Sequence, residues 1–346
     1  MEAKRLLRAA AKLGATQRLN SLNLGAYDAP LPGAPARVRA LVVGINAYGS
    51  PVPGRLDNAV SDARAIHAAM SSLPGAQSTL LTDCSKAAFE QALMDFRDGT
   101  GVCKGRGMKV TAAPETAAAA SERTLGVFFF AGHGLQVSGK NYLVPSDFKV
   151  PNRNDKLEVM LRDTARVCVS LDEVEQIMED ASVFAGSVLL DCCRNVPDFL
   201  AELGAKRSIG STRALPSGMS EPSPKVHDVM VTFATAPGKE ALDRSTRLRS
   251  HSPFTAALLT ALEKPLRLLD LNSVLTDAVL KDTGGKQRPH VGGSYGTEAG
   301  NLRLVAGAAD AAAQEAAAQA AGRAKEEEAD RLANAQEAAA RQAKAA

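Results

Sequence analysis

Two short apolar runs stand out along the chain because each ends abruptly in residues that can do chemistry. Residues 127–131 read Val-Phe-Phe-Phe-Ala and lead into Gly-His-Gly at 132–134, and residues 188–190 lead into Asp-Cys-Cys-Arg-Asn at 191–195. Continuous apolar runs of this length, bounded by turn residues, are typical of strands buried on both faces of a parallel sheet. Reactive groups in such sheets collect beyond the carboxyl ends of the strands, so we expect the two runs to end at one site.

The rest of the hydrophobic pattern alternates between strands and amphipathic helices. A helix beginning at Asp57 carries four apolar residues on one side, Ala59, Ala63, Ile66 and Met70. Another begins at Ser170, which serves as its cap, with two acids in its first turn. The further strands that the pattern predicts are 38–45, 78–81, 229–236 and an extended piece within 286–305, and the further helices are 86–97, 253–263 and 270–281. This alternation predicts an α/β fold, a doubly wound, mostly parallel sheet flanked by helices on both faces.

A histidine and a cysteine at the ends of the two central strands fit nucleophilic catalysis. Cys193 follows His133 by 60 residues. A thiol is an effective nucleophile only as thiolate, and a nearby imidazole can take its proton or, when protonated, lower its pKa. The glycines beside His133 let backbone approach a substrate closely, and the amides of Gly134 and Cys193 are candidates for holding an oxyanion.

Whole motifs around these residues resemble a known family. Residues 129–134, Phe-Phe-Ala-Gly-His-Gly, and 189–195, Leu-Leu-Asp-Cys-Cys-Arg-Asn, resemble the two catalytic signatures of the caspase-like peptidases (peptidase family C14), which include metacaspases and bacterial caspase homologues. Further matches occur in the family's order at 41–48, 56–63, 234–238, 252–258 and 287–289, so the resemblance covers roughly residues 38–305. It implies a caspase-like fold. The family's second signature reads Asp-x-Cys-Arg/His, which makes Cys193 the nucleophile, not Cys192, with His133 as its partner.

The same resemblance implies a pocket for the substrate residue that precedes the cut. In metacaspases an acid from the segment equivalent to 58–62 and the Asp two residues before the nucleophile line this pocket. Asp62 and Asp191 would then select Arg or Lys through charge-assisted hydrogen bonds. The segment reads Asn-Ala-Val-Ser-Asp instead of the metacaspase Gly-Cys-x-Asn-Asp. The alternative interpretation is that Asp62 is an exposed helical acid and Asp191 an ordinary residue at the end of a strand.

The leading functional prediction is a cysteine endopeptidase that cleaves after Arg or Lys through an acyl-thioester intermediate. Its catalytic residues are His133 and Cys193, and no third residue that orients the histidine can be chosen from the sequence. One alternative is a catalytically silent scaffold or regulatory protein that binds peptide segments in the same groove. Another is redox sensing by the adjacent thiols Cys192 and Cys193, although neighbouring cysteines are poorly placed to bridge without strain.

The composition divides the chain into three parts. We expect residues 1–37 to form a basic amphipathic helix and a linker, 38–305 the peptidase domain, and 306–346, rich in Ala, Glu, Gln, Lys and Arg, a solvated helical tail. Residues 99–123 are predicted to be an inserted surface loop. The loop at 204–226 combines Gly and Pro with Lys and Arg, so it is a candidate site of self-cleavage by an enzyme that prefers basic residues.

Charge and cysteine content restrict the environment and the partners. The formal net charge of +3 gives no argument for nucleic acid, and no apolar run is long enough to span a bilayer. Five irregularly placed cysteines do not form a disulfide framework, which favours a reducing compartment, the cytoplasm. The histidines and cysteines lack the spacing of metal ligands, so no cofactor is required. Some metacaspases depend on calcium, which scattered aspartates cannot establish. The expected partner is a protein or peptide substrate.

Overall fold

The structure is a computed structural model that describes the central part of the chain. The described residues are 37–49, 54–99, 109–110, 124–137, 140–150, 157–181, 183–192, 228–236, 239, 241–246 and 249–305. Four predicted features lie outside them: the N-terminal helix and linker except for Arg37, most of the inserted loop at 99–123, the candidate processing loop at 204–226, and the tail at 306–346. Cys193 also lies outside the described residues.

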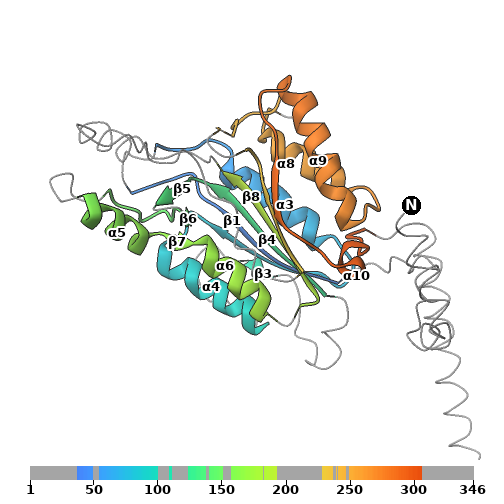
Figure 1. The fold of residues 1–346 in the computed structure, drawn as a ribbon, viewed down its shortest axis with the longest axis horizontal. Coiled ribbons are helices and arrows are strands. Elements are labelled where there is room, and N and C mark those ends of the chain that lie inside the picture. Colours follow the sequence, from blue (N-terminus) through green and yellow to red (C-terminus); the bar gives the residue numbers. More distant parts are fainter. Residues whose placement is uncertain are drawn as a thin grey trace, which may run out of the picture. The chain divides into compact units, whose positions relative to one another are not determined.

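A seven-stranded sheet forms the centre of the described region (Figure 1), in the order β10-β9-β8-β4-β1-β2-β3. Its parallel strands are β1 (Arg37–Gly44), β2 (Gln77–Thr82), β4 (Thr124–Gly132), β8 (Ala185–Cys192) and β9 (Val229–Phe233). Two short antiparallel strands close the edges, β3 (Lys109–Val110) beside β2 and β10 (His290–Gly293) beside β9. The doubly wound, mostly parallel α/β prediction is therefore confirmed.

The central strands are hydrophobic along their whole length because helices cover both faces of the sheet. Every residue of β4 and β8 is buried. Successive side chains of a strand point to opposite faces, so Phe129 packs in one core cluster while Phe128 and Phe130 pack in the other. The first cluster contains helices α3 (Ala59–Ser71), α8 (Pro253–Leu262) and α9 (Leu268–Thr283), and the second contains α4 (Lys86–Asp98) and α6 (Leu171–Asp180) (Figure 1).

The ends of the helices follow the expected capping chemistry in most places. The Ser85 side chain accepts the N–H of Ala88 at the start of α4, and Gly99 ends that helix in the left-handed conformation. The Ser252 side chain caps α8 in the same way, with Pro253 in its first turn. Ser170 occupies the cap position of α6, but its side chain makes no capping hydrogen bond.

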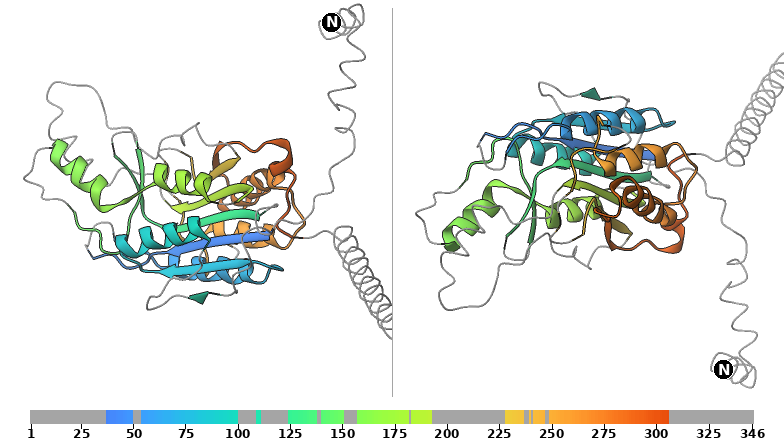
Figure 2. Two further views of the ribbon diagram at one scale, coloured as in Figure 1. Left: turned by 90° about the horizontal axis from the view of Figure 1, so that it is seen from below. Right: turned by 90° about the horizontal axis from the view of Figure 1, so that it is seen from above.

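Two regions differ from the sequence prediction. Only His290–Gly293 of the predicted extended piece at 286–305 is a strand, and it is followed by the short helix α10 (Thr297–Gly300). A second sheet, β5 (Gly134–Val137), β6 (Lys140–Leu143) and β7 (Val169–Ser170), was not predicted. It continues directly from the end of β4 and packs with α5 (Leu157–Val167), which lies at the opposite end of the described region from α9 and α10 (Figures 1 and 2).

No helix in the described part of the chain is long and apolar enough to cross a membrane.

Candidate active site

The two strands that carry the signatures pair directly at the centre of the sheet. β4 and β8 are parallel neighbours, and their register pairs Ala131 with Asp191 and Gly132 with Cys192. The predicted runs therefore end side by side at one edge, as parallel strands require. His133 is the next residue after the last residue of β4, and Cys193 directly follows β8 in the sequence.

Backbone and ring contacts hold His133 in place. Its N–H donates to the hydroxyl of Tyr48 (2.8 Å), and its carbonyl accepts the N–H of Val144 (3.0 Å). The ring nitrogen Nε2 lies 2.7 Å from the carbonyl oxygen of Gly54. Because a carbonyl only accepts, Nε2 carries the proton in this contact, which leaves Nδ1 of a neutral ring as the base. The Gly54 carbonyl thus orients the ring in the role for which the sequence offered no candidate.

The electrostatic surroundings of His133 favour the neutral ring. Burial lowers the pKa of His133, and the hydrogen bond to Gly54 and the charge of Asp243 raise it to a lesser extent. A neutral imidazole at working pH is able to accept a proton, which is the first requirement for a general base.

Tyr48 forms the support under His133. The Tyr48 hydroxyl donates to the carbonyl of Ile45 (3.2 Å) while it accepts from His133, and the two rings lie 4.9 Å apart between centroids. Gly132 makes room for this arrangement, because a Cβ there would lie 2.7 Å from the Phe130 ring and 3.0 Å from the Tyr48 hydroxyl. Sequence reasoning missed this role, although Tyr48 ends the family-like segment at 41–48.

The N–H of Gly134 points away from the second sheet. Gly134 pairs with Leu143 in the antiparallel β5–β6 ladder, and the bond from Val144 N–H to His133 O makes this a non-hydrogen-bonded pair. The ladder therefore does not use the Gly134 amide. The structure describes one of the two predicted oxyanion donors, and the second, the Cys193 amide, lies outside the described residues.

Asp62 is not an exposed helical acid, because it is only 2% exposed. It lies in the first turn of α3, and its two oxygens accept from two neighbouring residues. Nδ1 of His251 lies 2.7 Å from Oδ1, and the N–H of Ser252 donates to Oδ2 at 3.3 Å. Burial and the nearby charge of Asp191 raise the pKa of Asp62 far above its usual range.

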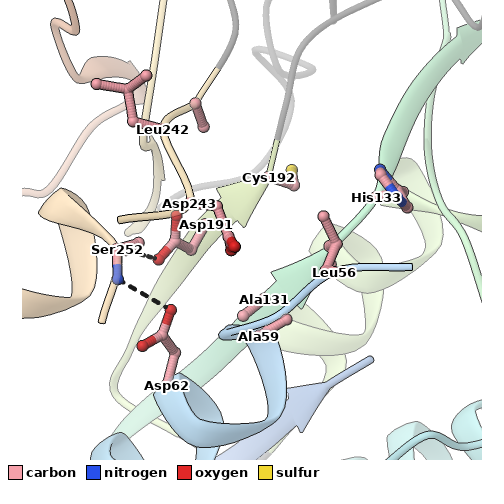
Figure 3. A pocket seen from close by; sticks show the side chains of 12 residues that line it. Leu56, Ala59, Asp62, Ala131, His133, Asp191, Cys192, Leu242, Asp243 and Ser252 are labelled. Carbon is pink, nitrogen blue, oxygen red and sulfur yellow. Dashed lines mark hydrogen bonds between the residues drawn. The ribbon is translucent and has the colours of Figure 1, made fainter. Parts of the chain in front are cut away.

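Asp191 lies in the same hydrogen-bond network. One of its oxygens accepts from the hydroxyl groups of Ser252 and Thr255, the latter at 2.7 Å. Ser252 therefore bonds to both carboxyl groups, through its N–H to Asp62 and through its hydroxyl to Asp191 (Figure 3). Burial raises the pKa of Asp191, and the two hydroxyl donors oppose this shift. The structure thus brings together the two acids that the sequence placed in one pocket.

These acids line a pocket beside His133 (Figure 3). The pocket is small and open to solvent on one side; its space, including that opening, is about 350 Å³. Its lining residues are Leu56, Ala59, Asp62, Ala131, Gly132, His133, Asp191, Cys192, Ala241, Leu242, Asp243 and Ser252. No Lys or Arg belongs to this lining. The pocket is therefore acidic, with leucines at positions that can contact an aliphatic stem.

Asp243 is a third acid of the pocket that sequence reasoning missed. It is half-buried, and burial raises the pKa of its carboxyl group. The Asn58 side chain donates to the Asp243 carbonyl, so the turn before α3 holds this loop against the pocket. The available signal was its position shortly after the family-like segment at 234–238, whose strand ends on the same face of the sheet.

Comparison with known proteins identifies the family. The family model of the caspase domain, peptidase family C14, matches residues 106–295, which is more than half of the 346-residue chain. The chain belongs to the caspase-domain family. Among solved structures, caspase-1 from Spodoptera frugiperda is similar at 13% sequence identity and a TM-score of 0.48, with 78% of this chain and 91% of that chain covered. A search of curated proteins found no match.

The caspase-domain match contains His133, Asp191, Asp243 and Cys193 but begins after Tyr48 and Asp62. The structure brings the segments before the match next to those inside it. β1, which precedes the match, is the direct neighbour of β4, and α3, which carries Asp62, follows β1. The site of this caspase domain is therefore built from segments on both sides of the boundary of the match.

Two further observations concern the packing of Cys192 and the metal-binding capacity of the described residues. Cys192 is 2% exposed and packs in the core cluster that contains Phe130 and Leu190, as expected of a structural cysteine. Within the described ranges, no group of three or more His, Cys, Asp or Glu side chains could hold a metal ion.

Proposed function

We propose that this caspase domain is a cysteine endopeptidase that cleaves peptide bonds after Arg or Lys, with Cys193 as nucleophile and His133 as general base. The observation that carries the proposal is the register of β4 and β8, which ends both signatures at one edge beside an acidic pocket. Cys193 follows Cys192 directly, and one trans peptide unit spans about 3.8 Å. Covalent continuity therefore supports a position for the thiol near that edge.

The proposed chemistry needs only one base and one nucleophile. His133 takes the proton of the Cys193 thiol at Nδ1, and the sulfur forms a bond to the carbonyl carbon of the substrate. The oxygen becomes an oxyanion, which the amides of Gly134 and Cys193 stabilise; one such donor can contribute about 2.7–4 kcal/mol. His133 then gives its proton to the leaving amine as the C–N bond breaks.

Deacylation repeats these steps with water. His133 removes a proton from a water molecule, whose oxygen attacks the thioester carbon, and the C–S bond breaks. The sulfur recovers its proton from the imidazolium, and the new carboxyl group leaves. The bond of the ring to Gly54 supports this cycle, because it keeps Nδ1 directed the same way throughout.

The charge and shape of the pocket support selection of a basic residue. Three carboxyl groups, Asp62, Asp191 and Asp243, line it, and none of its lining residues is Lys or Arg. The side chain of Arg or Lys has an apolar stem and a charged head. Leu56 and Leu242 suit the stem, and the carboxyl groups suit the head. A substrate with Asp before the bond would find no Lys or Arg among the lining residues and would be repelled by each of the acids that is ionised.

The test is the turnover of fluorogenic peptides with Arg, Lys, Gln or Asp before the scissile bond, with and without calcium. Native protein should cleave the Arg and Lys peptides, and Cys193→Ala should cleave none. Cleavage after Asp alone would remove the acidic-pocket assignment. No cleavage in any condition would favour the silent scaffold, in which the same groove binds peptides without turnover.

Self-cleavage at residues 204–226 is part of the same proposal. A basic loop beside an enzyme that prefers basic residues is a natural substrate. Purified native protein should produce two fragments that the Cys193→Ala protein lacks, and N-terminal sequencing should place the cut after Lys206, Arg207, Arg213 or Lys225. Identical gel patterns for the two proteins would eliminate this step.

A further inference from the structure

His251 connects the chain segment before α8 to the acidic pocket. Its Nδ1 lies 2.7 Å from Asp62 Oδ1, although 189 residues separate the two in sequence. We infer that His251 is a positioning residue that fixes the Asp62 carboxylate for binding of the substrate's basic side chain, and so determines how strongly the pocket selects Arg. This inference rests on the proposed function and assigns a specificity role to a residue outside the catalytic pair.

Several hydrogen bonds fix the backbone around His251. Its carbonyl accepts the N–H of Ser245 (2.7 Å), and the carbonyl of Ser250 accepts the Ser61 hydroxyl (3.2 Å). The next residue, Ser252, caps α8 through the N–H of Thr255 (2.9 Å). With its backbone held on both sides, the imidazole reaches Asp62 from a fixed position, and only 17% of its side chain is exposed.

The contact fixes both the position and the plane of the carboxyl group. Asp62 Oδ1 faces His251 while Oδ2 accepts the N–H of Ser252. Two donors on two different oxygens leave the carboxyl group little freedom to rotate. Burial lowers the pKa of His251, which favours the neutral ring, and the tautomer with its proton on Nδ1 is the one that donates this bond to Asp62.

The charges around Asp62 explain why such a donor is needed. Asp191 on β8 and Asp243 on the segment between β9 and α8 disfavour ionisation of Asp62, and His133 is the one cationic candidate among the lining residues. The neighbouring Arg244 is not a lining residue and pairs with Asp57 at 2.9 Å. Without the imidazole, the Asp62 carboxyl group would lose one of its two hydrogen-bond partners and would be free to turn from the other acids, so the pocket would hold a guanidinium group less firmly.

Three variants test the inference. His251→Ala removes the donor, whereas His251→Asn restores an amide N–H near the position of Nδ1. His290→Asn is the matched control, because His290 lies on β10 beside the Phe233 ring and outside the pocket. For a substrate with Arg before the bond, we expect His251→Ala to raise KM about tenfold with kcat changed less than about threefold. His251→Asn should recover most of the loss, and His290→Asn should resemble native protein.

A binding measurement makes the test independent of turnover. In the Cys193→Ala background, calorimetry gives the Kd of a peptide that ends in Arg, and His251→Ala should raise it about tenfold. Thermal melting of each variant identifies any general loss of structure. Native cleavage with unchanged KM and Kd in His251→Ala would overturn the inference and leave the proposed function standing. A loss in kcat alone, or equal losses in His251→Ala and His251→Asn with lowered Tm, would also overturn it. No cleavage by native protein, and no binding of the Arg peptide, would refute both proposals.

Discussion

The candidate site has two sides, one around His133 and one around Asp62 and Asp191, and different kinds of interaction hold them. On the His133 side, both hydrogen-bond partners are neutral: the Gly54 carbonyl accepts from the imidazole, and the Tyr48 hydroxyl accepts from the backbone N–H. On the other side, Asp62 and Asp191 are both buried, at 2% and 7% exposure, and the charge of Asp191 raises the cost of ionising Asp62.

The difference shows which side has favourable interactions before a substrate binds. The hydrogen bonds of His133 already give it the tautomer and orientation of a base, so nothing further must bind. Buried like charges are unfavourable until a cation joins them. In the empty protein a proton on Asp62 relieves this repulsion, as its raised pKa indicates, and under the proposed function the cationic head of a bound Arg or Lys side chain takes the place of that proton.

The largest effect should follow from neutralising the pocket. Asp191→Asn and Asp62→Asn should each lower kcat/KM for Arg substrates about 100-fold, equal to about 2.7 kcal/mol, because a desolvated charge partner is lost. The Gln substrate should lose far less, so the preference for Arg should collapse. Asp277→Asn, an exposed acid on α9, is the control. Equal losses for Arg and Gln substrates would show that these acids do not determine specificity.

Loss of the Tyr48 hydroxyl should have a smaller effect on the opposite side. Tyr48→Phe leaves the buried N–H of His133 without its partner, and an unmade hydrogen bond of this kind costs about 1–3 kcal/mol. We expect kcat to fall about tenfold with KM nearly unchanged, because His133 shifts while the carboxyl groups of the pocket do not. Tyr142→Phe on β6 is the matched control. A rise in KM without loss of kcat would contradict the separation of the two sides.

The smallest effect should appear in stability. The pKa of Asp62 is raised in the folded protein, so above about pH 4 the native state holds a proton that the unfolded chain has released, and stability falls as pH rises toward the raised pKa. An asparagine side chain at this position does not titrate. Asp62→Asn should therefore melt about 2–4 °C above native protein near pH 5, an effect of about 1 kcal/mol, and the gap should widen from there toward about pH 9. Melting curves across this range measure it, and a gap that narrows with rising pH would refute the raised pKa.

Much of the fold could be predicted from sequence because its elements follow strong local patterns. The predicted helix at 86–97 is observed at Lys86–Asp98, where Ser85 and Gly99 supply the start and stop signals. The second sheet escaped prediction because its strands have only two to four residues, too few for a hydrophobic period to register. The helix predicted at 270–281 begins two residues earlier, because Arg267 occupies the cap position without a typical capping side chain.

The candidate site was only partly predictable. The motifs indicated His133, Asp62 and Asp191, which the structure brings to one pocket, and the register of β4 and β8 explains why. Two of the groups that support them, Gly54 and His251, had no sequence signal. Gly54 acts through a backbone carbonyl 79 residues from His133, and His251 contacts Asp62 across 189 residues. Contacts of this range depend on how the loops pack above the sheet, which local periodicity does not record.

The most direct test of the central claim is covalent labelling by a substrate-like reagent. A peptidyl chloromethyl ketone with Arg in the recognition position should alkylate native protein once, and peptide mapping by mass spectrometry should locate the adduct at Cys193. The account predicts that the matching Asp reagent reacts far more slowly and that Asp191→Asn removes this preference. An adduct at Cys192 or another cysteine, or equal rates for the Arg and Asp reagents, would contradict it.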